Sequence, residues 1–173
     1  MKMRSKRPIS YEEAKARAGA LCSRCEQCSP DLLKKFQTWG LSQGDANRLI
    51  TELKRLRWVD DTRYARAFAH DKVSYSGWGR HKIAAALAAR RLPREAVESA
   101  FDDVDEEEYE EVALRVVRAK VRSMKAPLSD YETKAKVYRF AMSRGFETSL
   151  VSRIVARVAA EQAEEAEAEA EDE

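Results

Sequence analysis

The sequence predicts an all-α protein arranged as an elongated tandem array of three three-helix repeats. The first observation is composition: only six Gly and four Pro occur in 173 residues, which disfavours a sheet with many turns. The second is internal repetition. The segments WGLSQGDANRLITEL, RRLPREAVESAFDDV and RGFETSLVSRIVARV, aligned on Leu41, Leu92 and Phe146, place apolar residues five, eight, nine and twelve positions on, which is the spacing of a helical stripe.

Three helix starts share one pattern, which is the third observation. Ser10, Asp60 and Asp105 suit the N-cap position, and each has an apolar residue just before it and another four residues after it. Glu13 and Glu108 complete a capping box at the first and third of these starts. We therefore expect helices at about 10–25, 30–39, 42–57, 60–75, 79–91, 93–103, 105–124, 130–144 and 147–160, with ends defined to within 2–4 residues.

Each predicted repeat has a capped first helix, a second helix ending in a tight turn, and a third helix. Gly40 and Gly145 stand where the second helix ends in the outer repeats, and Arg91 takes that place in the middle one. Ser29 is expected to cap the helix that Pro30 opens. The predicted divisions are a basic N-terminal tail at 1–9, repeats at 10–58, 59–104 and 105–160, and an acidic tail at 161–173. The acidic tail either prolongs the last helix or, because it lacks an apolar face, is frayed or disordered, and we expect the second.

The charge is unevenly distributed along the chain. The formal net charge is +2, but residues 159–173 hold eight acids and no Lys or Arg, so all 32 basic residues lie in the remainder. A basic body favours an anionic partner such as nucleic acid.

The sequence has no apolar run long enough for a membrane span, and MKMRSKRP leads into YEEAKARA rather than an apolar leader segment, so we expect a soluble cytoplasmic protein.

Motifs for enzymatic or metal chemistry are absent from the sequence. Cys22, Cys25 and Cys28 have the spacing of a metal-binding run, but no fourth cysteine follows, and His70 and His81 lie far along the chain. A structural zinc ion needs four ligands, so reduced thiols are the simpler interpretation. No P-loop, G-x-S-x-G or H-E-x-x-H motif occurs. We expect no catalytic residue, no metal and no cofactor.

Basic residues cluster in and beside the second predicted repeat. They are either a solvated face or a surface for phosphate and protein contacts, where several cations release counterions together. Trp78, between two glycines, is either a core residue or a partner contact. The candidate partner and DNA-binding residues are Lys54, Arg55, Arg57, Arg63, Arg66, Lys72, Arg80, Lys82, Arg90 and Arg91.

The segments VDDTRYARAFAHDK and GWGRHKIAAALAARRL, together with the three-helix repetition, resemble the RecX family, bacterial regulators of the RecA recombinase. The resemblance covers most of residues 10–158 and is most specific between Trp58 and Phe101. The first repeat departs from the family by lacking a Glu-Leu element. The matched family positions, interpreted as caps and core, are Asp60, Asp61, Tyr64, Ala65, Gly79, Ile83 and Leu87.

The resemblance implies a non-enzymatic, monomeric protein of DNA repair and the SOS response. Such a protein binds RecA and the RecA filament on single-stranded DNA, lies along the groove of that filament and limits its growth or activity. Two alternatives stay open. One is a DNA-binding protein built from helix-turn-helix-like units and independent of RecA. The other is a metal or redox sensor that uses the three cysteines.

Overall fold

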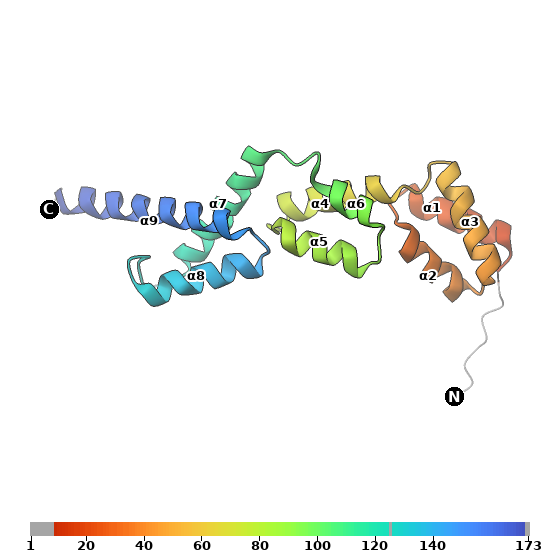
Figure 1. The fold of residues 1–173 in the computed structure, drawn as a ribbon, viewed down its shortest axis with the longest axis horizontal. Helices are drawn as coiled ribbons and strands as arrows, with labels where there is room; N and C mark the ends of the chain where they lie inside the picture. The colour runs from red at the N-terminus through yellow and green to blue at the C-terminus, as the bar shows by residue number, and fades with distance from the viewer. Residues whose placement is uncertain (1–8, 125, 172–173) are drawn as a thin grey trace, which may run out of the picture. The chain divides into compact units, whose positions relative to one another are not determined.

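The computed structural model describes residues 9–124 and 126–171, and within these ranges it contains nine α-helices, one short 3-10 helix and no strand (Figure 1). The predicted all-α class is confirmed. The predicted basic tail lies outside the described residues except for Ile9. The helices are α1 (Tyr11–Cys22), α2 (Ser29–Trp39), α3 (Gln43–Arg55), α4 (Asp61–Ser74), α5 (Arg80–Ala89), α6 (Arg94–Glu98), η1 (Ser99–Phe101), α7 (Glu106–Arg122), α8 (Tyr131–Ser143) and α9 (Thr148–Glu171).

The helix starts follow the predicted caps. Ser10 and Glu13 form a complete capping box, in which the Ser10 hydroxyl accepts from the Glu13 amide at 3.2 Å. The Asp60 carboxylate accepts from the Arg63 amide at 3.0 Å, and that of Asp105 accepts from the Glu108 amide at 2.8 Å. Each cap satisfies an amide that has no partner within its own helix. The polar residues at these starts are therefore explained locally.

The ends of the three second helices share one backbone conformation. Gly40, Arg91 and Gly145, which the sequence alignment places at equivalent positions, have φ values of 89°, 63° and 92°. Glycine adopts this left-handed conformation without a steric penalty, whereas a side chain makes it costly. The three predicted turns thus have equivalent geometry although the middle one lacks glycine.

Two helices differ in length from the prediction. α6 ends at Glu98 and continues as the 3-10 helix η1, a common way for a helix to tighten at its end. α9 extends to Glu171, so the acidic tail prolongs the last helix as far as that residue and the expected fraying is wrong there. Alanine and glutamate are strong helix formers, and Glu161 is held by Arg118 at 2.7 Å and by Arg157 at 3.2 Å.

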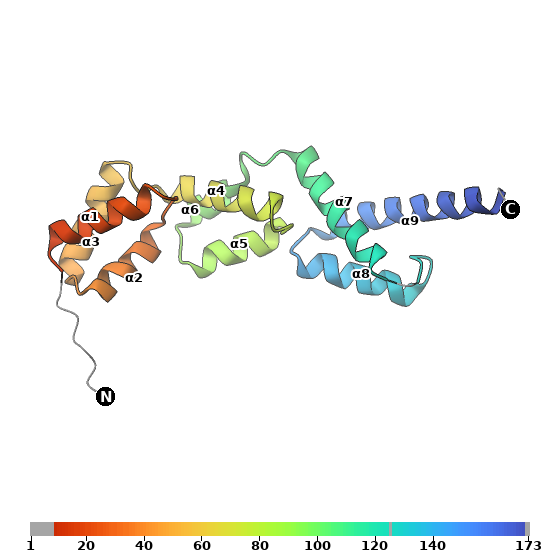
Figure 2. The same cartoon turned by 180° about the vertical axis from the view of Figure 1, so that it is seen from behind.

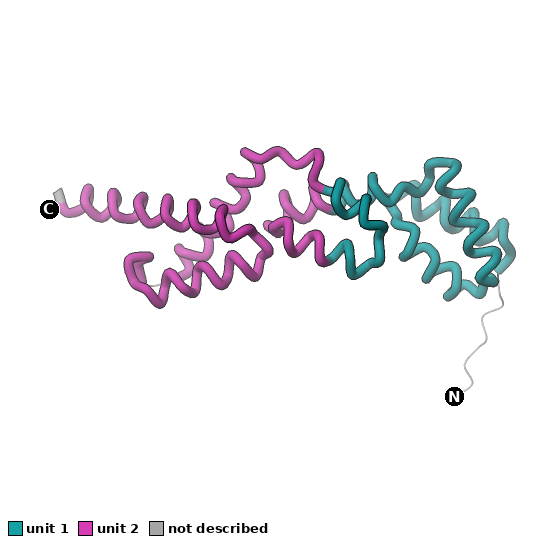
Figure 3. The backbone as a smooth tube through the Cα atoms, viewed as in Figure 1, with its two compact units in different colours: residues 1–68, 86–100 teal, residues 69–85, 101–173 magenta. Residues whose placement is uncertain are grey.

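The chain divides into two compact units (Figure 3). Unit 1 consists of residues 1–68 and 86–100, and unit 2 consists of residues 69–85 and 101–173. Helices α4 and α5 each contribute residues to both units. The units divide the second predicted repeat, so the bounds of the repeats stay a prediction.

The core of unit 1 is formed where α1, α2 and α3 pack side by side (Figures 1 and 2). Its apolar stripes recur at helical spacing, so each helix turns one face inward. Its buried residues include Ala14, Ala18, Leu32, Phe36, Leu49 and Leu53, all fully shielded from solvent.

The core of unit 2 is formed mainly by α7, α8 and α9, which also lie side by side in both views (Figures 1 and 2). Tyr109 and Phe146 are each 1% exposed, and their ring centroids are 5.7 Å apart. The buried residues of these three helices also include Val112, Leu114, Val117, Val137, Val151 and Val155. None of the helices in the described ranges is long and apolar enough to cross a membrane.

Candidate functional site

The predicted basic residues of unit 1 fall into two groups. In the first group, Lys54 is paired with Asp61 at 2.9 Å and Arg63 with Glu26 at 2.6 Å. Arg90 lies 3.5 Å from Asp31, and its guanidinium is 5.0 Å from the Phe68 ring. These charges are already partly neutralised within the protein. Arg66 also has an internal partner, since it donates to the Ser99 carbonyl at 3.3 Å.

The second group consists of Arg55, Arg57 and Arg91, whose side chains are exposed. Among the described residues none of the three forms an ion pair with a carboxylate. Arg55 closes the last turn of α3, and Arg57 and Arg91 follow the C-terminal ends of α3 and α5 with φ values of 57° and 63°. All three therefore present a cation to solvent at the negative end of a helix dipole.

The Asp61 carboxylate is buried and connects three helix ends, in addition to placing a charge at a helix start. We call it the Asp61 tether. It is 7% exposed and accepts hydrogen bonds from the Ser29 amide at 2.7 Å, the Ser29 hydroxyl at 2.5 Å and the Lys54 ammonium at 2.9 Å. Burial opposes its ionisation, but the bonds from Ser29 and then Lys54 outweigh that cost, so the pKa of Asp61 lies below its ordinary value. The carboxylate joins the starts of α2 and α4 to the end of α3.

The prediction that Ser29 caps α2 is wrong. Cys28 occupies the N-cap position without a side-chain hydrogen bond, and the Ser29 hydroxyl donates to Asp61. A carboxylate is a stronger acceptor than a neutral group, which explains why the hydroxyl turns away from its own helix.

Most of the other family-motif residues lie in the core. Ala65, Ile83 and Leu87 are fully buried. The Tyr64 ring stacks on that of Phe68, with centroids 6.1 Å apart.

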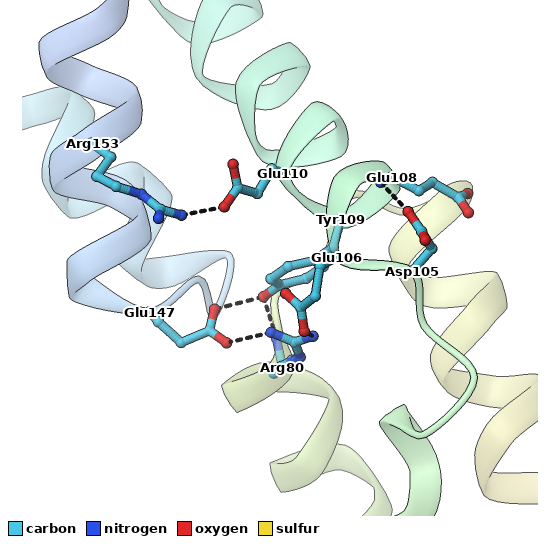
Figure 4. Close-up of polar contacts among 8 residues, drawn as sticks. All are labelled: Arg80, Asp105, Glu106, Glu108, Tyr109, Glu110, Glu147 and Arg153. Atoms are coloured by element: carbon cyan, nitrogen blue, oxygen red, sulfur yellow. Dashed lines mark hydrogen bonds and ion pairs between the residues drawn. The ribbon is translucent and has the colours of Figure 1, made fainter.

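Arg80 is the centre of a polar cluster in unit 2 (Figure 4). Its guanidinium contacts Glu106 at 2.5 Å and Glu147 at 3.3 Å, and it lies 4.3 Å from the Tyr109 ring centroid. Partial burial opposes the charge on Arg80, but the two carboxylates outweigh it and raise its pKa. We therefore interpret Arg80 as a residue that joins the starts of α5, α7 and α9, although its predicted role in partner binding stays a prediction.

Tyr109 completes this cluster through its hydroxyl. The oxygen donates to Glu147 at 2.7 Å and accepts from the Arg80 backbone amide at 3.0 Å. Burial, and then the bond to Glu147, raise the pKa of Tyr109 well above its ordinary value, so the hydroxyl stays protonated at physiological pH. On neighbouring turns of α7 and α9, Arg153 pairs with Glu110 (Figure 4).

Gly79 brings two backbone segments of unit 2 into direct contact. Its amide donates to the Arg144 carbonyl at 2.8 Å, and the His81 amide donates to the Gly145 carbonyl at 3.0 Å. A Cβ added at Gly79 would lie 2.2 Å from the Gly145 carbonyl, and one added at Gly145 would lie 2.4 Å from the Lys82 Cβ. The sequence predicted only a bend at Gly79. We call this contact between residues 79–82 and 144–146 the glycine joint.

Trp78 lies beside the glycine joint and is half-buried. The Lys72 and Lys82 ammonium nitrogens lie 5.0 Å and 4.5 Å from its ring centroid. The sequence allowed Trp78 to be either a core residue or a partner contact. In the structure its side chain is partly buried and partly exposed, so both interpretations stay open. Its ring faces cations, which interact favourably with the electron-rich face of an indole.

The three cysteines lie in different environments at the end of α1 and the start of α2. Cys22 is half-buried, Cys25 is exposed and Cys28 is 1% exposed. Within the described ranges, no group of three Cys, His, Asp or Glu residues could hold a metal ion.

We expect Cys25 to be alkylated first and Cys28 last when the folded protein is treated with iodoacetamide at pH 8. Burial raises the pKa of Cys28 to about 11, so on the order of one thousandth of it is the reactive thiolate at that pH. Peptide mass mapping over time measures the order. Cys25→Ser should remove the fast phase, and denaturant should make all remaining thiols react. Equal rates for Cys25 and Cys28 in the folded protein would contradict the burial of Cys28.

Sequence reasoning missed the residues that complete these clusters. Glu147 and Arg144 carry no motif signal, and their partners are far along the chain: Glu147 bonds Arg80, and Arg144 donates to the Gly77 carbonyl at 3.2 Å. The only available signal was the alignment of Gly145 with Gly40 as helix-ending residues, and this does not reveal what the turn contacts.

Comparison with known proteins finds two family models that match parts of the chain. The family model described as the second three-helix domain of RecX matches residues 60–100, and the model of the third matches residues 106–155. A "Regulatory protein RecX" of Chromobacterium violaceum is 28% identical over 143 residues, covering 82% of this chain and 88% of the relative. One of Clostridium botulinum is 27% identical over 122 residues, covering 70% of this chain and only 57% of the relative.

Two solved structures share the fold. RecX from Lactobacillus salivarius aligns with a TM-score of 0.74 at 15% identity, covering 85% of this chain and 95% of that one. A second crystal structure of a regulatory protein RecX also gives a TM-score of 0.74, at 18% identity, with 83% and 70% covered. Because the two matched domains together span more than half of the sequence, the chain belongs to the RecX family of regulatory proteins.

Proposed function

We propose that the chain is a non-enzymatic regulator that binds RecA and its single-stranded DNA filament and inhibits the ATPase and recombinase activity of that filament. Family membership supports a regulatory role, since the compared relatives are named regulatory proteins. The RecX resemblance supplies RecA as the partner. The proposal places the protein in the cytoplasm as a monomer, without a cofactor.

The proposed contact with the filament rests on three exposed arginines of unit 1, which are Arg55, Arg57 and Arg91. A side chain at positive φ costs about 1 kcal/mol relative to glycine, and Arg57 and Arg91 both adopt this conformation. Glycine would end both helices at lower cost, as Gly40 and Gly145 do. Residues held in costly conformations are associated with function, so we assign these arginines to contacts with the filament.

The test is RecA-dependent ATP hydrolysis on single-stranded DNA. We expect the wild-type protein to suppress hydrolysis at stoichiometric amounts. The double variant Arg57→Gly/Arg91→Gly should suppress it less, while its thermal stability stays equal or rises because the backbone conformation is relaxed. Removing two phosphate contacts should also make DNA-dependent binding less sensitive to salt.

Arg24→Gln is the matched control. Arg24 is an exposed arginine of the same unit and has no carboxylate partner among the described residues. The Arg24→Gln variant should suppress ATP hydrolysis as strongly as the wild-type protein does. No suppression by the wild-type protein would reject the proposal, and salt-dependent DNA binding without any capture on immobilised RecA would favour a RecA-independent DNA-binding protein.

A further inference from the structure

We propose that the C-terminal end of α4 carries a contact site for single-stranded DNA. The site, here called the α4-end patch, consists of Lys72, Tyr75, Trp78, Lys82 and Arg115, all in unit 2. The inference deepens the proposed function, because it names the nucleic-acid contact that a regulator of a DNA-bound filament could use. A base would stack on Tyr75, and the cations would hold the flanking phosphates.

The first step is the exposure of Tyr75, whose side chain follows the last turn of α4 and is 83% exposed. An exposed aromatic ring alone has no functional meaning, and Tyr131 at the start of α8 is 87% exposed. The difference between these two tyrosines is in their surroundings. Tyr75 is three residues from both Lys72 and Trp78 in the chain, and it directly follows Ser74, whose carbonyl accepts from Arg115.

The second step is the concentration of positive charge. The ammonium groups of Lys72 and Lys82 both lie within 5.0 Å of the Trp78 ring centroid. The exposed Arg115 donates to the Ser74 carbonyl at 3.3 Å, which brings a third cation to the residue that precedes Tyr75. Within the described ranges, neither Lys82 nor Arg115 forms an ion pair with a carboxylate. Cations held together repel one another, and a bound phosphate relieves that repulsion.

The third step is that the patch has a fixed frame. The Trp78 amide donates to the Lys72 carbonyl at 2.9 Å, and the Gly77 amide donates to the Val73 carbonyl at 3.2 Å. Arg144 donates to the Ser76 and Gly77 carbonyls from the other side. A Cβ added at Gly77 would lie 2.7 Å from Val116, so the loop packs directly on α7. The backbone that carries these side chains therefore does not have to be ordered on binding.

The fourth step is the chemical match between the patch and a single strand. The Glu108 carboxylate accepts from the Ser74 hydroxyl at 3.1 Å and keeps its negative charge, but the three cations of the patch outnumber it. The combination of an open aromatic ring with clustered cations suits a single strand, because its bases are free to stack on a ring while its backbone follows the charges. A duplex keeps its bases stacked on one another, so it would use the cations but not Tyr75.

The test measures fluorescence anisotropy of a labelled oligothymidylate with the free full-length protein. We expect Tyr75→Ala to weaken binding by roughly 5- to 150-fold, the range for loss of one base–aromatic stack. Tyr75→Phe should keep wild-type affinity, and Tyr131→Ala, the equally exposed control, should be neutral. Duplex DNA should bind Tyr75→Ala as it binds the wild type. Because Tyr75 is exposed, its loss should leave the melting temperature unchanged.

The cations are tested through the salt dependence of the same affinity. Lys82→Gln and Arg115→Gln should each lower the slope of log affinity against log salt by about 0.7, the value for one phosphate contact on a single strand. Lys134→Gln, an exposed lysine on α8, should not change it.

The outcomes separate this inference from the proposed function. Equal binding of wild type and Tyr75→Ala, equal losses for Tyr75→Ala and Tyr131→Ala, or no binding of the oligonucleotide at low salt would each overturn the α4-end patch. Capture on immobilised RecA without DNA reports the protein partner separately, and Tyr75→Ala should leave it intact. If the wild-type protein binds the oligonucleotide through Tyr75 but has no effect on RecA, the α4-end patch is supported and the proposed function as a RecA regulator is rejected.

Discussion

Gly79→Ala is expected to break the glycine joint and destabilise unit 2 by about 3–5 kcal/mol. The added methyl would lie 2.2 Å from the carbonyl carbon and oxygen of Gly145 and 2.3 Å from the amide nitrogen of Phe146. Backbone atoms cannot swing aside as a long side chain can, so the two segments must separate. Overpacking of this kind costs about 1–3 kcal/mol, and the two backbone hydrogen bonds lost with it add about 1 kcal/mol each.

Hydrogen exchange measures this effect directly, because the joint protects particular amides. The Gly79 and His81 amides donate across the joint in the wild-type protein, and both positions should exchange faster in Gly79→Ala. Gly44→Ala is the control. A Cβ there meets only the Ser42 hydroxyl at 4.0 Å, and alanine favours a helix over glycine, so this variant should be neutral or slightly more stable. Unchanged protection in Gly79→Ala would show that the segments do not touch.

Asp61→Asn is expected to destabilise unit 1 by about 2–3 kcal/mol. The substitution removes the ion pair to Lys54 and leaves one acceptor oxygen for the Ser29 amide and hydroxyl, which both donate to the carboxylate. Losing hydrogen bonds to a buried charged group costs more than losing neutral ones. Denaturant unfolding followed by hydrogen exchange of the Ser29 amide measures the loss in this unit. A ΔΔG near zero would contradict the tether.

The pH dependence of stability is a second test of the role of Asp61. The pKa of Asp61 is lower in the folded protein than its ordinary value of 3.8, so the folded state holds its proton less tightly than the unfolded chain does. The stabilisation is therefore complete above pH 3.8 and is lost as the pH falls through the folded pKa. The difference between wild type and Asp61→Asn should shrink in acid. Asp60→Asn is the control, because asparagine caps a helix as well as aspartate.

The helices and their order could be predicted because their signals are local. The caps at Ser10, Asp60 and Asp105 satisfy amides three residues away, a distance that the sequence displays directly. The repeat alignment even placed Arg91 correctly with Gly40 and Gly145, all three of which have positive φ. Apolar periodicity and capping act within a few turns of one helix, so composition and spacing are sufficient to find them.

The polar clusters could not be predicted because their partners are distant in sequence. Arg80 meets Glu147 sixty-seven residues away, and Ser29 meets Asp61 thirty-two residues away. In the sequence, Arg80 is one base among several, and Asp61 is one acid of a capping pair. Pairing of this kind depends on tertiary packing. The sequence therefore predicted Arg80 as a surface cation, whereas in the structure Arg80 is partly buried and its charge is balanced by Glu106 and Glu147.

The glycine joint also limits how this protein can evolve. Each missing side chain makes room for different atoms: the vacancy at Gly79 is filled by the turn at Gly145, and the vacancy at Gly145 is filled by Lys82. Since the two collisions are separate, no compensating mutation at one position can rescue a larger residue at the other. Revertants selected from a Gly79→Ala strain should therefore restore glycine itself or alter the path of the chain around residues 144–146, rather than exchange one side chain for another.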